Sequence, residues 1–281
     1  MCDVGMTATT QKTGGDGEPQ AVQVFRECVN AIRTKKLIRR ASSQDKEFHF
    51  QNWIRDRLQR TKLAFETGGR NSYPDFRLVA HTVGFEVKGL AYPGRELNYD
   101  CNSQVPTGFH NGRAIYYVFG RYPSEPDGNT YPLLDLVICH GDFLNADHDY
   151  VHQNKSVKGF GSYGDIMIRD RKMYVAPTPF GLVSGVAHAE TLILPAEVDA
   201  GTEMKCVGSV VRIEAAKMIV GYSFNLKTNT IIPQAIPNPS MGCTHHFRAW
   251  RVAGSPGEPV ALVPKCGAQQ VEEVDQADEQ E

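Results

Sequence analysis

The sequence predicts an α/β protein: a mixed β-sheet flanked by N-terminal helices, with a β-rich C-terminal half. Three observations support this class. Apolar residues recur at helical spacing in two segments before residue 63, whereas residues 76–139 contain short apolar runs rich in β-branched and aromatic side chains. From Gly181 onward, strands and turns predominate.

The two helices are predicted ahead of the sheet. The first, within 20–40, is indicated by its apolar residues Val22, Phe25, Val29, Ile32 and Leu37. Basic residues between them could follow a phosphate backbone or form a solvated face, and both interpretations stay open. The second helix runs to about Lys62; Ser42 or Ser43 could cap it, and Glu47 falls in its first turn, where an acid favours the helix dipole.

The segment from Pro74 to Gly89 combines two acids and a lysine with residues that favour strands. Glu86 and Lys88 are two residues apart, so on a strand their side chains leave the same face. If the segment folds as a hairpin with residues 80–81 at its tip, Asp75 lies directly opposite Glu86. The sequence therefore predicts that the two carboxylates converge.

Converging carboxylates repel each other unless a cation or a proton intervenes. Hard oxygen ligands with open positions suit Mg²⁺ better than zinc. Lys88, beside them, can orient and help to activate a water molecule or neutralise charge on a phosphate under attack. The chemistry implied is phosphodiester hydrolysis.

Pro74-Asp75, ten intervening residues and Glu86-Val87-Lys88 resemble the motif of the PD-(D/E)XK nucleases, and within them the type II restriction endonucleases. The resemblance implies a restriction-endonuclease-like fold, with Asp75 and Glu86 as ligands of Mg²⁺ and Lys88 acting on the attacking water. Many members place a further acid on a helix before the motif. Glu47 is the first candidate for this metal ligand and Glu66 the second, although helix capping also accounts for Glu47.

Two regions are predicted to contact DNA. A Pro- and Gly-rich loop after the motif carries Asn102, Ser103 and Gln104. The amides of Asn and Gln can pair with adenine, although residues of these types also serve turn formation. The strand predicted over Ala114–Phe119, beside the motif strand, begins after Arg113. The second region is a predicted β-ribbon, 165–168 and 172–176, which could enter a major groove or form an exposed hairpin tip. The ribbon and the segment before it contain Lys155, Lys158, Arg169, Arg171 and Lys172.

Two histidine-bearing segments contain residue types that can bind zinc. The first contains His140, Asp142, Asp147, His148, Asp149 and His152, but it lacks regular ligand spacing, and a polar loop explains it more simply. The second could combine Cys243 and His245 or His246 with Cys206 or Cys266. No CxxC pair anchors it, so neither segment is predicted to bind zinc.

Composition sets the remaining bounds. The chain has 281 residues, 41% hydrophobic and 22% charged, which is ordinary for a globular protein with a substantial core. Its formal net charge of −2 gives no overall attraction to nucleic acid, and its seven cysteines without regular spacing favour reduced thiols. No apolar run could span a bilayer and no signal peptide is recognisable, so we expect a cytoplasmic protein without membrane contact.

The domain organisation follows from these segments. Residues 1–19 are predicted to be a disordered tail and 269–281 an acidic disordered tail. Residues 20–268 would form a single endonuclease domain, with a catalytic core over 20–145 and a β-rich DNA-binding part over 146–268.

The predicted function is Mg²⁺-dependent hydrolysis of double-stranded DNA at a short specific sequence. By its resemblance the protein would be a homodimer, paired with a cognate DNA methyltransferase. One alternative is a PD-(D/E)XK nuclease that acts in repair or on branched or modified DNA. An alternative of another class is a non-enzymatic, β-rich binding protein in which the motif is accidental.

Overall fold

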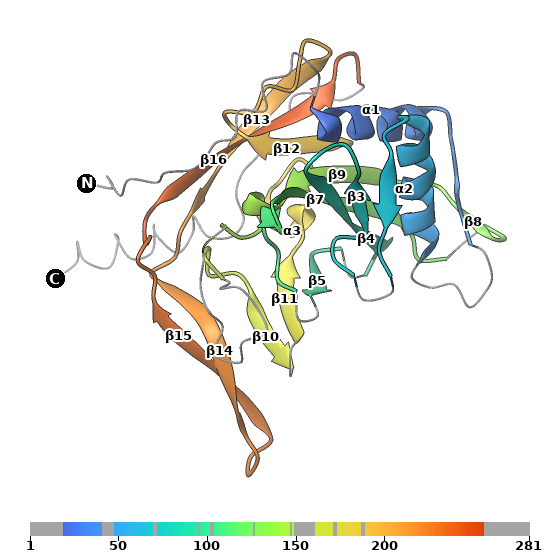
Figure 1. Ribbon diagram of the computed structural model, residues 1–281. Coiled ribbons are helices and arrows are strands. Elements are labelled where there is room, and N and C mark those ends of the chain that lie inside the picture. The colour runs from blue at the N-terminus through green and yellow to red at the C-terminus, as the bar shows by residue number, and fades with distance from the viewer. Residues whose placement is uncertain are drawn as a thin grey trace.

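A nine-stranded mixed sheet forms the centre of the molecule (Figure 1). The computed structural model describes residues 19–40, 48–69, 72–94, 96–101, 104–125, 127–146, 148, 161–170, 173–186 and 189–255. The strands run in the order β13-β16-β12-β9-β7-β4-β3-β2, and β6 also pairs with β7. Two neighbouring pairs, β4 with β7 and β9 with β12, are parallel, and the others are antiparallel.

The strands of this sheet come from both predicted parts of the domain. They are β2 (Phe65–Thr67), β3 (Phe76–Leu78), β4 (Val83–Tyr92), β6 (Phe109–His110), β7 (Arg113–Pro123), β9 (Asp135–His140), β12 (Thr191–Pro195), β13 (Met204–Ile213) and β16 (Thr244–Val252). The mixed α/β class is thus confirmed. The predicted strand beside the motif strand is confirmed too, because β7 pairs with β4 over the whole length of β4.

Smaller elements surround the sheet. The helices are α1 (Gln20–Arg33), α2 (Phe48–Arg60), the 3-10 helix η1 (Gly141–Phe143) and α3 (Pro179–Leu182). A three-stranded sheet joins β5 (Asn98–Cys101), β11 (Met173–Pro177) and β10 (Met167–Asp170). Two strand pairs complete the fold: β1 (Ile38–Arg39) with β8 (Thr130–Tyr131), and β14 (Lys217–Asn225) with β15 (Thr230–Pro237).

Alternation along the strands gives the sheet two buried faces. Tyr116 and Val118 of β7 pack in one apolar cluster with residues of α1 and α2. Tyr117 and Phe119 belong to the other cluster, which includes residues of η1, α3, β5 and β11. The two N-terminal helices therefore cover one face of the sheet, as the sequence predicted, and the small three-stranded sheet covers the other.

A pair of glycines determines where α2 sits. Gly89 of β4 and Gly120 of β7 are register partners, and both face the helices. Phe50 of α2 fills the space above them: a Cβ added at Gly120 would overlap its ring, and one added at Gly89 would lie 3.0 Å from its Cβ. Small residues here let the helix approach the sheet closely.

Part of the loop predicted after the motif is a strand. Residues 98–101 form β5, which pairs antiparallel with β11 from Tyr174–Cys101 to Pro177–Asn98. The predicted β-ribbon exists as β10 and β11. The sequence did not predict β5 for two reasons. The segment is rich in Pro and Gly, and its pairing partner lies more than seventy residues later in the chain.

Among the described residues, no helix is both long enough and apolar enough to cross a membrane. In the same part of the chain the cysteines form no disulfide.

Gly120→Ala should destabilise the protein by about 1–3 kcal/mol, because the new methyl group must displace the Phe50 ring from a packed core. Urea unfolding would measure the change. Gly69→Ala is the matched control, since a Cβ there meets nothing within 4 Å. Equal unfolding midpoints for the two variants would contradict this account of α2 packing.

Candidate active site

The hairpin of β3 and β4 has the register that the motif predicted. Phe76 lies opposite Phe85, and Arg77 lies opposite Gly84, which places Asp75 opposite Glu86. The backbone N–H of Asp75 donates to Glu86 Oε2 at 3.3 Å, and that of Val87 donates to Asp75 Oδ2 at 2.8 Å. Each carboxylate is therefore bonded to the strand that carries the other.

Lys88 belongs to the same group. Its Nζ donates to Glu86 Oε1 at 2.6 Å, and the side chains of Glu86 and Lys88 are 12% and 27% exposed. The ammonium lies 5.9 Å from the ring centre of Tyr99 on β5. A charge-assisted hydrogen bond of this length holds the lysine beside the carboxylates and leaves it reachable from solvent.

Gln51 of α2 completes the contacts of Asp75. Its Nε2 donates to Asp75 Oδ1 at 3.0 Å. The sequence had offered other residues for this position: Glu47 lies outside the described residues, and Glu66 is an exposed residue of β2 opposite Arg77. A signal for Gln51 was present, because it follows Glu47 by four residues and so would share its helix face.

The electrostatics of this group favour a bound cation. Burial, followed by repulsion from Glu86, raises the pKa of Asp75 to about 7, although the Val87 N–H and Lys88 act in the opposite direction. Burial alone would lower the pKa of Lys88, but Glu86 and then Asp75 outweigh it and raise that pKa. Lys88 is therefore an ammonium at neutral pH, and Asp75 carries an unfavourable charge.

Tyrosines form the wall behind the carboxylates. Tyr117 of β7 is the register partner of Glu86, and its hydroxyl lies 2.8 Å from that of Tyr73. The rings of Tyr117 and Tyr99 lie 6.4 Å apart, and both residues are buried. The sequence had not indicated these residues; they exclude water from the sheet side of the site.

A cavity of about 500 Å³ is lined by residues of β4, β7 and the small three-stranded sheet. Residues 89–91 of β4, which directly follow the lysine, form one side of it, and residues 98–100 of β5 form another. Arg169 of β10 also lines it and pairs with Asp100 at 2.5 Å. Strand β5, which directly precedes the first predicted DNA-contacting residues, thus belongs to the same small sheet as the predicted β-ribbon.

The other predicted DNA contacts are distributed differently. Arg113 donates from Nη1 to the carbonyl oxygens of Leu78, at 2.8 Å, and His81, at 2.9 Å, so it braces the turn of the motif hairpin. Gln104 is partly buried. The rest lie outside the described residues: Asn102, Ser103, Lys155, Lys158, Arg171 and Lys172.

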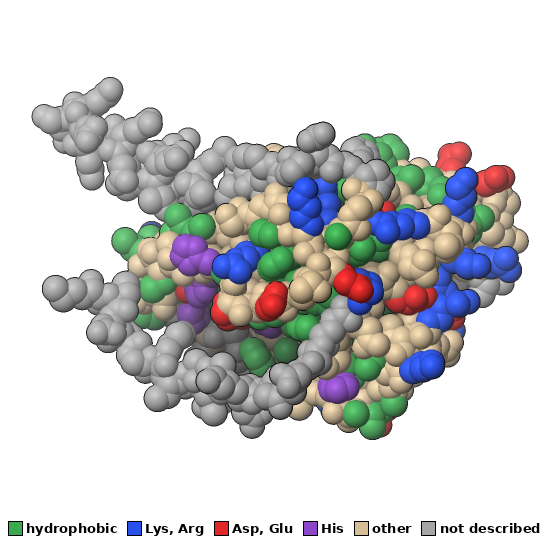
Figure 2. Space-filling view, turned by 90° about the horizontal axis from the view of Figure 1, so that it is seen from above, with side chains coloured by type: hydrophobic (Ala, Val, Ile, Leu, Met, Phe, Trp, Pro, Cys, Tyr) green, Lys and Arg blue, Asp and Glu red, His purple; other side chains and the backbone are tan. Residues whose placement is uncertain are grey.

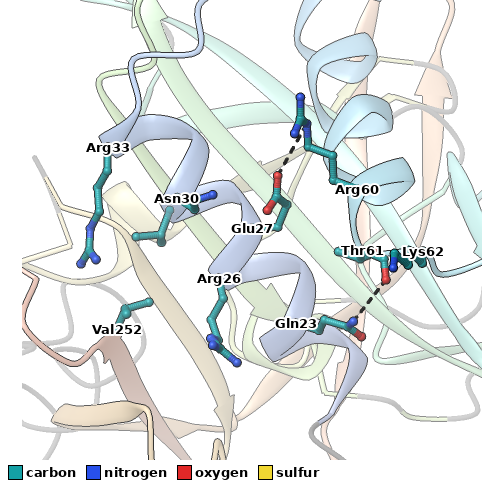
Figure 3. Close-up of a pocket in the computed structure, with 10 residues that line it drawn as sticks. Gln23, Arg26, Glu27, Asn30, Arg33, Arg60, Thr61, Lys62 and Val252 are labelled. Atoms are coloured by element: carbon teal, nitrogen blue, oxygen red, sulfur yellow. Dashed lines mark hydrogen bonds and ion pairs between the residues drawn. The ribbon is translucent and has the colours of Figure 1, made fainter.

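A second cavity, of about 610 Å³, lies between α1, the end of α2 and β16 (Figure 3). None of its lining residues belongs to the carboxylate site. Among them, Arg26 pairs with Glu203, and Arg60 lies 3.9 Å from Glu27. Figure 2 likewise shows basic and acidic side chains interspersed on the face seen from above. Arg26 of α1 thus lies beside an acid rather than on a purely positive surface.

No family model, curated protein or solved structure matches this chain in comparisons with known proteins. The chemistry of the site is therefore argued from its own residues. Two carboxylates that lie opposite each other on a hairpin, a lysine and a polar amide form a set that can hold a hard divalent cation next to an ammonium.

Asp75→Asn should stabilise the metal-free protein, and the gain should grow with pH. Because the pKa of Asp75 is raised by folding, ionising this carboxyl costs stability. The cost is absent below the pKa of the unfolded chain, near 3.8, and is complete above the pKa of the folded chain, about 7. We expect the stability gain of Asp75→Asn over the unsubstituted chain to increase by on the order of 1 kcal/mol or more between acidic and mildly alkaline pH.

Urea unfolding in EDTA measures this difference. Asp56→Asn, at an exposed position of α2, is the control for a lost surface carboxylate. If the effect of Asp75→Asn is independent of pH, the carboxylates do not repel each other as described.

Proposed function

We propose that the chain is a type II restriction endonuclease of the PD-(D/E)XK class, with a restriction-endonuclease-like sheet, that hydrolyses phosphodiester bonds in double-stranded DNA at a short specific sequence. The observation that carries this proposal is the apposition of Asp75 and Glu86 across a hairpin, with Lys88 bonded to Glu86 at 2.6 Å. These residue types in this arrangement fit the motif that the sequence resembles.

The residues fit Mg²⁺. Asp75 and Glu86 offer oxygen ligands, which this cation prefers, and a dication between them would offset the burial and repulsion that raise the pKa of Asp75. Gln51 fixes one oxygen of Asp75 in the way that outer hydrogen bonds orient metal-ligating carboxylates. Glu47 stays the predicted further ligand.

The chain's own groups can then be given roles. Bound Mg²⁺ would supply charge stabilisation at the scissile phosphate. Lys88 keeps its proton because Glu86 holds it, so its ammonium orients the attacking water and neutralises charge on the phosphate rather than removing a proton. The tyrosine wall, Tyr73 with Tyr117, keeps bulk water away from the buried side of the carboxylates.

The position of the small sheet supports a DNA substrate. Its strands β5 and β10 line the cavity, and the ring centre of Tyr99 on β5 lies 5.9 Å from the Lys88 ammonium, so a duplex with its scissile phosphate at Lys88 would pass close to this sheet. Arg169 there is half-exposed, and release from Asp100 would let it reach a phosphate or a guanine.

The wider setting follows from the proposed class. A symmetric recognition sequence calls for a homodimer with one active site for each strand. We further propose a cytoplasmic enzyme that is accompanied by a cognate DNA methyltransferase, which would protect the host's own sites.

The purified protein should cut phage DNA into discrete fragments with Mg²⁺ and leave it intact with EDTA. Asp75→Ala should abolish cleavage because it removes a metal ligand, and Lys88→Ala should slow it by about 100-fold or more. Agarose gels and mapping of the fragment ends would measure both effects. Asp56→Ala and Lys205→Ala, at exposed positions, are the controls and should cut normally.

The alternatives give different results in the same assay. Cleavage restricted to branched or modified DNA would indicate a repair or structure-dependent nuclease. If a pool of unmethylated genomes and branched substrates stays intact in every condition, the chain is a non-enzymatic binding protein and the motif is accidental.

Gln51→Ala should raise the Mg²⁺ concentration needed for half-maximal cleavage by about tenfold, because Asp75 loses the bond that orients it. The rate at saturating Mg²⁺ should change much less. Gln59→Ala, an exposed glutamine of the same helix, is the matched control. An unchanged Mg²⁺ requirement in Gln51→Ala would show that the amide does not support the metal site.

A further inference from the structure

A second group of potential metal ligands lies outside the carboxylate site. His148 Nε2 and His245 Nε2 each lie 2.7 Å from the same oxygen, Glu214 Oε1. The three ligand atoms all lie within 4.8 Å of one another. The Glu214 side chain is fully buried, whereas His148 and His245 are 11% and 28% exposed.

Distant parts of the chain meet at this cluster. His148 follows η1, Glu214 directly follows β13, and His245 is the second residue of β16. His148 and His245 lie 66 and 31 positions from Glu214 in the sequence. Backbone bonds fix the geometry: Glu214 N donates to Cys243 O, and Gly242 N donates to Glu214 O, both at 2.9 Å. The convergence is therefore built by the fold.

The environment of Glu214 resembles that of a metal-ligating carboxylate. Its second oxygen, Oε2, accepts from Nδ2 of the buried Asn238 at 2.9 Å. Such outer hydrogen bonds typically orient carboxylate ligands. Arg212, two residues earlier, has its own acid in Asp165. If both imidazoles are neutral, they leave the buried charge of Glu214 uncompensated, and a dication would compensate it.

We propose that His148, Glu214 and His245 bind one Zn²⁺ ion. Two imidazole nitrogens and one carboxylate oxygen are a ligand set that zinc accepts, with bonds of about 2.0–2.2 Å. Ligands on a tetrahedral ion lie roughly 3.3–3.5 Å apart, so binding lengthens the two 2.7 Å contacts by less than 1 Å. A water molecule can take the fourth position.

The position of the site indicates a structural role. The ribbon of β14 and β15 extends away from the core sheet (Figure 1). Its base is joined to the cluster because Asn238, just after β15, contacts Glu214 and also donates to Ser162 O at 3.4 Å. A zinc ion here would fasten the base of the ribbon to the segment that follows η1.

The test is the zinc content of the full-length protein after dialysis against ZnCl₂ and then buffer, measured by inductively coupled plasma mass spectrometry. The unsubstituted chain and His246→Ala should retain about one zinc, whereas His148→Ala and His245→Ala should retain almost none. His246 is an exposed neighbour on the same strand and is the matched control. Zinc should also raise the melting temperature of the unsubstituted chain by several degrees and leave that of His245→Ala unchanged.

A second measurement needs no variant. Co²⁺ added to the metal-free protein should give the visible absorption of a tetrahedral site with nitrogen and oxygen ligands. Three results would overturn the proposal: no zinc retained by the unsubstituted chain, equal zinc in His245→Ala, or a Co²⁺–thiolate band, which would place the ion on cysteines. In the first case the cluster is a hydrogen-bonded group in which protonated histidines compensate Glu214.

Discussion

Pairing of β3 with β4 forces the carboxylates of Asp75 and Glu86 together, at a cost that the raised pKa of Asp75 expresses. Lys88 compensates part of this charge, and the Val87 N–H and Gln51 amide satisfy the oxygens of Asp75. A bound cation would compensate the negative charge that remains. A strongly perturbed pKa at a specific charge cluster is typical of a functional site rather than of a stabilising ion pair.

The rest of the fold keeps this arrangement in place. Gly89 and Gly120 let α2 approach the sheet, and because Phe50 seats there, Gln51 reaches the hairpin. Arg113 closes the hairpin turn from the neighbouring strand β7. On the opposite face, the small sheet of β5, β11 and β10 packs on the core, and Tyr99 of β5 lies beside Lys88. Packing on both faces therefore positions residues that local sequence alone would leave free.

Residue spacing and periodicity predicted much of the fold and the centre of the site. The register that sets Asp75 opposite Glu86 follows from counting outward from residues 80–81, and the structure confirms it. The helices and the strand after Arg113 followed from periodicity. The contact of Gln51 with Asp75 depends on how α2 packs, and β5 depends on its partner β11, which is remote in sequence, so local patterns predict neither.

The histidine cluster shows the same limit. In the sequence, His148 and His245 lie in two separate segments, and no pattern points to Glu214. No spacing rule could join them, because their contacts span 66 and 31 residues and exist only once β13, β16 and the segment after η1 have packed.

The central claim is that Asp75 and Glu86 share a divalent cation, and crystals soaked in Mn²⁺ test it most directly. The account predicts an anomalous diffraction peak between the two carboxylates; no peak there, with Lys88 still bonded to Glu86, would contradict it.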